Sequence, residues 1–145
     1  MKDLPRFLLD SANSGVYAAP AGVQALKPGA VACGLAWFEL DLTGVIDKAT
    51  FLSRCQTVFS LPATFGHNWD ALADYLEDLS WQRARGYIVF GSHGSEFARG
   101  APHDCVTALE ILSAAATYWL AQNKTFIALL DADTRGSRKV KLFPA

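Results

Sequence analysis

The sequence predicts a small α/β domain with a three-stranded, mainly parallel sheet packed by three to four helices. Apolar segments of strand length at 35–42, 86–91 and 125–130 are separated by segments whose apolar residues recur at helical spacing. Strands that alternate with helices imply right-handed crossovers and hence a parallel sheet. With 145 residues, 51% of them hydrophobic, the chain can form one domain with a sizeable core.

Residues 1–35 are predicted to form an N-terminal extension that packs on the domain or is linked to it. This segment is rich in Ala, Gly and Pro, so we expect only one short strand near Val16-Tyr17 and a short helix around 23–26. The domain proper then begins at residue 36. Its first core strand is LAWFELDL (35–42), which stops at Thr43-Gly44.

Two amphipathic helices are predicted next. Asp47 can cap a helix over 48–60, which ends at Leu61-Pro62. Asn68 can cap a second helix after a short loop. The expected buried stripe of that second helix consists of Trp69, Leu72, Leu76 and Leu79.

The second half of the domain alternates strands and helices. GYIVFG (86–91) is typical of a buried parallel strand, and TFIALL (125–130) predicts the last core strand. A long helix is expected over 103–122, with Asn123 at its C-terminal end. The domain is predicted to end at 131, and 132–145 to be a solvated basic tail carrying Arg135, Arg138, Lys139 and Lys141. The residues of the long helix expected to point inward are Val106, Leu109, Leu112, Ala116 and Trp119.

Composition and charge exclude several classes of function. Thirteen lysines and arginines nearly balance fourteen aspartates and glutamates, so the whole molecule has no pull toward nucleic acid or an anionic membrane. The N-terminus is not typical of a secretory signal, and no apolar run approaches the ~20 residues of a membrane span. Three widely spaced cysteines argue against disulfides or a zinc site and favour a reducing cytoplasm. We expect no cofactor and no metal.

The second predicted helix carries an unusual charge pattern. No lysine or arginine occurs between Arg54 and Arg83, whereas Asp70, Asp74, Glu77 and Asp78 follow at helical spacing and should share one face. Like charges one turn apart cost about 0.2 to 0.5 kcal/mol per pair, and negative charge near a helix C-terminus is unfavourable. Such a face suits a cationic protein site, where carboxylates can take the places of phosphates.

The segment LPATFGHNWDALADYL (61–76) resembles the signature of the barstar family of ribonuclease inhibitors. The matching features are a proline, an aromatic-glycine loop and an asparagine that leads into a helix with two aspartates four residues apart. The order of strand, helix, helix, strand, helix, strand is also similar to that family over about 36–131. The residues that carry the resemblance are Pro62, Phe65, Gly66, Asn68, Trp69, Asp70, Ala71, Leu72 and Asp74.

The resemblance implies a non-enzymatic inhibitor whose loop and second helix occlude the basic active site of a ribonuclease. Asp74 would reach furthest into the site and Asp70 would support it, while Gly66 would supply a positive φ in the loop. The chain departs from the family pattern at Thr64, His67 and Ala73. The predicted partner-binding residues are Asp74, Asp70, Gly66, Asn68, Phe65, Thr64, Ala73 and Asp78.

Alternative functions remain open from the sequence. A binding or regulatory module of the same fold with a non-nuclease partner is one alternative. A small enzyme is another, with a site near His93, Glu96 and His103, although GSHGSEF (91–97) matches neither a phosphate loop nor a nucleophile elbow and predicts a crossover turn. Trp81 follows the acidic helix and is a candidate interface anchor, whereas His67 is predicted to be a loop residue that can also cap the helix.

Overall fold

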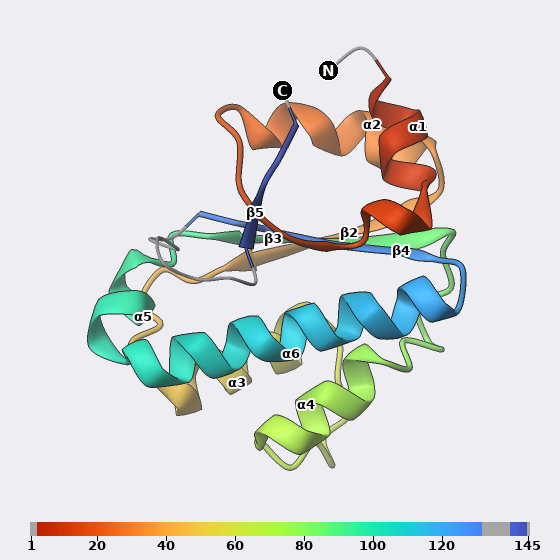
Figure 1. The fold of residues 1–145 in the computed structure, drawn as a ribbon. Helices are drawn as coiled ribbons and strands as arrows, with labels where there is room; N and C mark the ends of the chain where they lie inside the picture. The colour runs from red at the N-terminus through yellow and green to blue at the C-terminus, as the bar shows by residue number, and fades with distance from the viewer. Residues whose placement is uncertain (1–2, 132–139, 145) are drawn as a thin grey trace.

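A five-stranded, fully parallel sheet forms the centre of the computed structural model, which describes residues 3–131 and 140–144 (Figure 1). The strand order is β2-β3-β4-β1-β5. Strand β3 lies between β2 and β4, with Leu35 opposite Gly86 and Gly86 opposite Thr125. The strands are β1 Gly15–Ala18, β2 Leu35–Asp41, β3 Gly86–Ser92, β4 Thr125–Leu130 and β5 Val140–Leu142.

The prediction of an α/β fold with a parallel sheet is confirmed, but the prediction of three strands is wrong. The short strand expected near Val16-Tyr17 is β1, and it pairs with β4 inside the sheet. Strand β5 lies within the segment predicted to be a solvated tail and pairs with the other edge of β1. Its three residues are too few to show a strand pattern, which is why the sequence did not predict it. Arg135, Arg138 and Lys139 lie outside the described residues.

Helices cover both faces of the sheet (Figure 1). On one face α1 and α2 pack over Ile88, Phe90 and Ile127, together with the short 3-10 helix η2. On the other face α3 and α6 pack over a larger core that includes Val89 and Phe126. The helices are α1 Leu4–Leu9, η1 Ser11–Asn13, η2 Val23–Leu26, α2 Lys27–Ala32, α3 Lys48–Val58, α4 Trp69–Leu76, α5 Ser95–Gly100 and α6 Pro102–Ala121.

The alternation of side chains along β3 explains this arrangement. Tyr87 and Val89 belong to one core, Ile88 and Phe90 to the other, and every residue of β3 is buried. A strand buried on both faces needs a continuous apolar run, as GYIVFG provides. The segments before β2 therefore complete the second layer over the sheet.

Most predicted helix features hold, with two corrections. Asp47 caps α3 through the backbone N–H of Thr50, and Asn123 adopts a positive φ after α6. Val106 was expected to point inward but is 51% exposed, because it lies outside the stripe formed by the buried residues of α6. The turn predicted at 91–97 contains the start of α5, whose buried Phe97 stacks on Phe51 at 5.0 Å.

Candidate functional site

Helix α4 is short and depends on its N-terminal cap and its buried side chains. The side chain of Asn68 accepts a hydrogen bond from the backbone N–H of Ala71 at 2.8 Å, which confirms the predicted cap. Leu72 and Leu76 are buried against the core, and α4 lies across the outer side of α6, far from the sheet (Figure 1). Eight residues are too few for a stable isolated helix, so packing on α6 is what orders α4.

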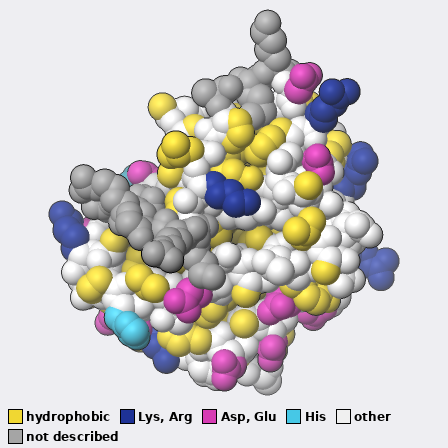
Figure 2. Space-filling model, in the orientation of Figure 1, with side chains coloured by type: hydrophobic (Ala, Val, Ile, Leu, Met, Phe, Trp, Pro, Cys, Tyr) yellow, Lys and Arg dark blue, Asp and Glu magenta, His cyan; other side chains and the backbone are white. Residues whose placement is uncertain are grey.

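The carboxylates of this region point away from the core. Asp70 and Asp74 are exposed on α4, one helical turn apart. Because α4 ends at Leu76, Glu77 is its C-cap and Asp78 lies just beyond it, so the predicted helix was slightly too long. Asp78 is exposed and Glu77 is half-buried. Acidic side chains are visible at the end of the molecule where α4 lies (Figure 2).

These carboxylates have no internal counter-ion in the described structure. Residues 3–131 and 140–144 form one ion pair of Lys27 with Glu39, and one contact of His93 with Asp41 that is ionic only with a protonated histidine; neither involves α4. One cation does approach the helix: the ammonium of Lys48, on α3, lies 5.6 Å from the centroid of the Trp69 ring. Lys48 therefore stacks on the aromatic ring and leaves the carboxylate of Asp70 without an ion-pair partner among these residues.

The loop before α4 is anchored by Phe65. This side chain is only 3% exposed, and its ring meets Tyr75 edge to face at 6.1 Å. Its backbone N–H also donates to the carbonyl of Pro62. Phe65, predicted as a partner contact, is thus a core residue here, whereas Thr64 and Gly66 beside it are exposed and Ala73 is half-buried. The loop is fixed from the inside and presents Thr64 and Gly66 outward.

Gly66 was expected to supply a positive φ in the loop, and this prediction is wrong. Gly66 has no positive φ; the left-handed residue is His67, with φ 50°. A Cβ on Gly66 would lie 2.8 Å from Nδ2 of Asn68, so glycine leaves space for the capping side chain. His67 does not cap α4: its Nδ1 lies 3.1 Å from the carbonyl oxygen of Phe65.

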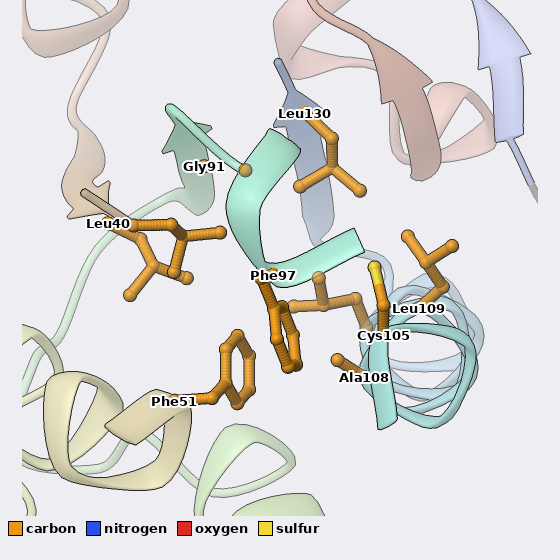
Figure 3. A pocket seen from close by; sticks show the side chains of 11 residues that line it. Leu40, Phe51, Gly91, Phe97, Cys105, Ala108, Leu109 and Leu130 are labelled. Carbon is orange, nitrogen blue, oxygen red and sulfur yellow. The ribbon is translucent and has the colours of Figure 1, made fainter. Parts of the chain in front are cut away.

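The residues of the alternative enzyme site are not gathered in a polar cleft. His93 Nδ1 lies 3.1 Å from Oδ1 of Asp41, with both side chains more than half exposed. Glu96 and His103 are exposed on separate helices, α5 and α6. The nearby hollow is an apolar cavity of about 30 Å³ under α5, lined by Leu40, Phe51 and Cys105 among others (Figure 3). The described residues contain no group of three or more potential metal ligands.

Two aromatic side chains complete the surface beside α4. Trp81 is 39% exposed, its indole N–H donates to the carbonyl of Phe59 at 2.9 Å, and its ring meets Tyr75 edge to face at 5.8 Å. The sequence pattern indicated Trp81 as a candidate interface residue. It did not indicate Tyr75, which lies between Asp74 and Leu76. Its only sequence signal is its place on the flank between the acidic and apolar stripes.

No helix of the described chain is long and apolar enough to span a bilayer.

The fold and this surface define a small α/β domain whose helix α4 presents carboxylates outward. Residues 35–131 match the model of the family described as Barstar (barnase inhibitor), which is two thirds of the chain, and the chain belongs to this family. The comparison with curated proteins finds no match. The match spans β2 to the residue after β4, whereas the segments before β2 and after residue 131 lie outside it.

Proposed function

We propose that this chain is a stoichiometric inhibitor that occludes the basic active site of a ribonuclease, acting from the cytoplasm. One observation carries the proposal: in a member of a family of barnase inhibitors, α4 presents Asp70 and Asp74 outward with no ion-pair partner among the described residues. A ribonuclease that binds phosphates with arginine and lysine offers the complementary charge. The three cysteines are free, which suits a reducing compartment.

Inhibition would proceed by occlusion, without chemistry by this chain. Asp74 lies in the second turn of α4 and Asp70 in the first, about 6 Å apart along the helix axis. Two carboxylates at this spacing can each accept paired N–H donors from a guanidinium. The exposed Gly66 and Thr64 allow close approach of the partner backbone, and Asp78 extends the acidic surface past the helix end.

The test is calorimetric titration of a purified barnase-class ribonuclease with wild type and Asp74→Ala. We expect the substitution to weaken binding by about 2 kcal/mol or more, because truncated charge pairs at interface centres have effects of this size. Thermal stability should be unchanged or slightly higher, since a like-charge pair is relieved. Binding of the wild type should also weaken steeply with salt.

Glu110→Ala is the matched control, because Glu110 is an exposed carboxylate on α6 and its loss changes the net charge equally. Equal affinities of Asp74→Ala and wild type would refute the assignment of this face. If no barnase-class ribonuclease binds, the same variants applied to proteins captured from the host would test the alternative of a non-nuclease partner. That alternative deserves a test because the chain departs from the family pattern at Thr64, His67 and Ala73.

A further inference from the structure

Trp81 is a large aromatic side chain whose orientation is fixed although its ring is exposed. It follows α4 in the turn before β3, and 39% of its surface is accessible. The bond from its indole N–H to the carbonyl of Phe59 satisfies its polar atom. Tyr75, on α4, supports the ring edge to face, and Phe65 supports Tyr75 in the same way. The ring is therefore already ordered in the free protein. A partner that binds it does not bear the entropic cost of ordering this side chain.

Four other aromatic rings have a lysine of the described chain over them, and Trp81 has none. Lys48 lies 5.6 Å from the centroid of Trp69, Lys124 5.7 Å from that of Trp119, and Lys141 5.6 Å from that of Tyr17. Within residues 3–131 and 140–144, no lysine or arginine lies over Trp81, although the exposed Arg83 is only two positions away. The exposed part of this ring is thus open to a cation from outside.

The flat face of the indole selects a guanidinium among cations. Tyr75, whose ring meets that of Trp81, follows Asp74 directly on the acidic helix, so the indole lies at the edge of the acidic surface. A guanidinium can stack its plane on the indole, and its charge suits a site at the edge of an acidic surface. Lysine provides a compact ammonium without a flat face, so it gains less from such a surface.

We propose that Trp81, with Tyr75 supporting it, forms an arginine-stacking ledge beside the C-terminal end of the acidic helix. Its occupant is an arginine side chain of the cationic protein that α4 binds, and in this respect the inference rests on the proposed function. Asp70 and Asp74 attract both arginine and lysine, and each can also bind a guanidinium through paired N–H donors. The ledge adds a further preference for arginine that depends on the aromatic face of residue 81, and this dependence can be measured separately.

The decisive comparison is between Trp81→Phe and Trp81→Leu. Both substitutions remove the hydrogen bond to Phe59 and keep an apolar side chain, but only phenylalanine keeps an aromatic face. The probes are an oligoarginine and an oligolysine peptide of equal length, titrated by calorimetry at one ionic strength. We expect the wild type to bind oligoarginine roughly threefold or more tightly than oligolysine. Trp81→Phe should keep most of this preference, and Trp81→Leu should lose the part that residue 81 contributes.

Two control variants separate the ledge from general charge attraction. Asp74→Ala should weaken binding of both peptides, and in this background Trp81→Leu should still lower the arginine-to-lysine ratio. Trp37→Leu changes a tryptophan that packs in the other core, so it should leave the ratio unchanged. Thermal unfolding of each variant establishes that it is folded before its affinity is compared.

The outcomes distinguish this inference from the proposed function. An arginine preference that follows the aromatic face of residue 81 supports the ledge even if no ribonuclease is inhibited. Equal arginine-to-lysine ratios for wild type, Trp81→Phe and Trp81→Leu would overturn the ledge even if a ribonuclease binds through Asp74.

Discussion

The indole N–H of Trp119 donates a buried hydrogen bond of 2.8 Å to the backbone carbonyl oxygen of Leu76. Leu76 is the last residue of α4, and the final carbonyl groups of a helix have no partner within that helix. Trp119 belongs to α6, the longest helix of the domain. One side chain of α6 thus supplies a hydrogen-bond donor to the last carbonyl group of the acidic helix and holds that end of the helix in place.

Replacing Trp119 with phenylalanine should therefore destabilise the protein. The carbonyl of Leu76 would be left buried without its donor, which costs about 1 to 3 kcal/mol. Chemical denaturation should show this loss in the free energy of unfolding. Trp37→Phe is the control, since the indole of Trp37 donates to the partly exposed side chain of Glu39, where water can replace it. Equal losses for the two variants would contradict the role given to the bond at Leu76.

The other end of α4 provides a second prediction. Asn68→Ala removes the acceptor for the N–H of Ala71 and should lower the free energy of unfolding by about 1 kcal/mol. Asn68→Ser should keep most of the stability, because the serine hydroxyl can accept the same bond. Denaturant titrations of the three proteins measure both effects. A serine variant as unstable as the alanine variant would show that the cap is not what stabilises this end.

The acidic helix was predictable from sequence because its signals are local. The cap at Asn68, the apolar spacing of Leu72 and Leu76, and the absence of basic residues between Arg54 and Arg83 all lie within one short segment. The fold class was predictable for a similar reason, since β2, β3 and β4 are apolar runs with clear boundaries. These features depend on few long-range contacts.

The rest of the site depends on contacts between distant segments. The burial of Phe65 follows from its packing on Tyr75, which the loop sequence does not specify. Lys48 reaches Trp69 only because the fold brings the side chains near the start of α3, Lys48 and Phe51, to the first residue of α4. Strand β5 is recognisable only through its pairing with β1, and Phe143 just after it packs on Tyr17 at 5.6 Å between ring centroids. Periodicity within a segment carries no information about such partners.

Asp41 provides a prediction about pH at the C-terminal end of β2. Hydrogen bonds from the Thr43 hydroxyl and then from the Thr43 backbone N–H, with a smaller contribution from His93, lower the pKa of this carboxyl from 3.8 to about 2. A carboxyl whose pKa is lower in the folded state stabilises the fold above its unfolded pKa. That contribution is lost as the pH falls toward the folded pKa.

Asp41→Asn should therefore be less stable than the wild type near neutral pH, and the gap should close as the pH falls from about 4 to about 2. Because the side chain of Asp41 is 58% exposed, solvent screening keeps the gap to a few tenths of a kcal/mol. Denaturant titrations of both proteins at a series of pH values measure it. His93→Ala should give a smaller gap, because Thr43 contributes more than His93 to the lowered pKa. A gap for Asp41→Asn that stays constant down to pH 2 would mean that the carboxyl gains nothing from its charged form in the folded protein.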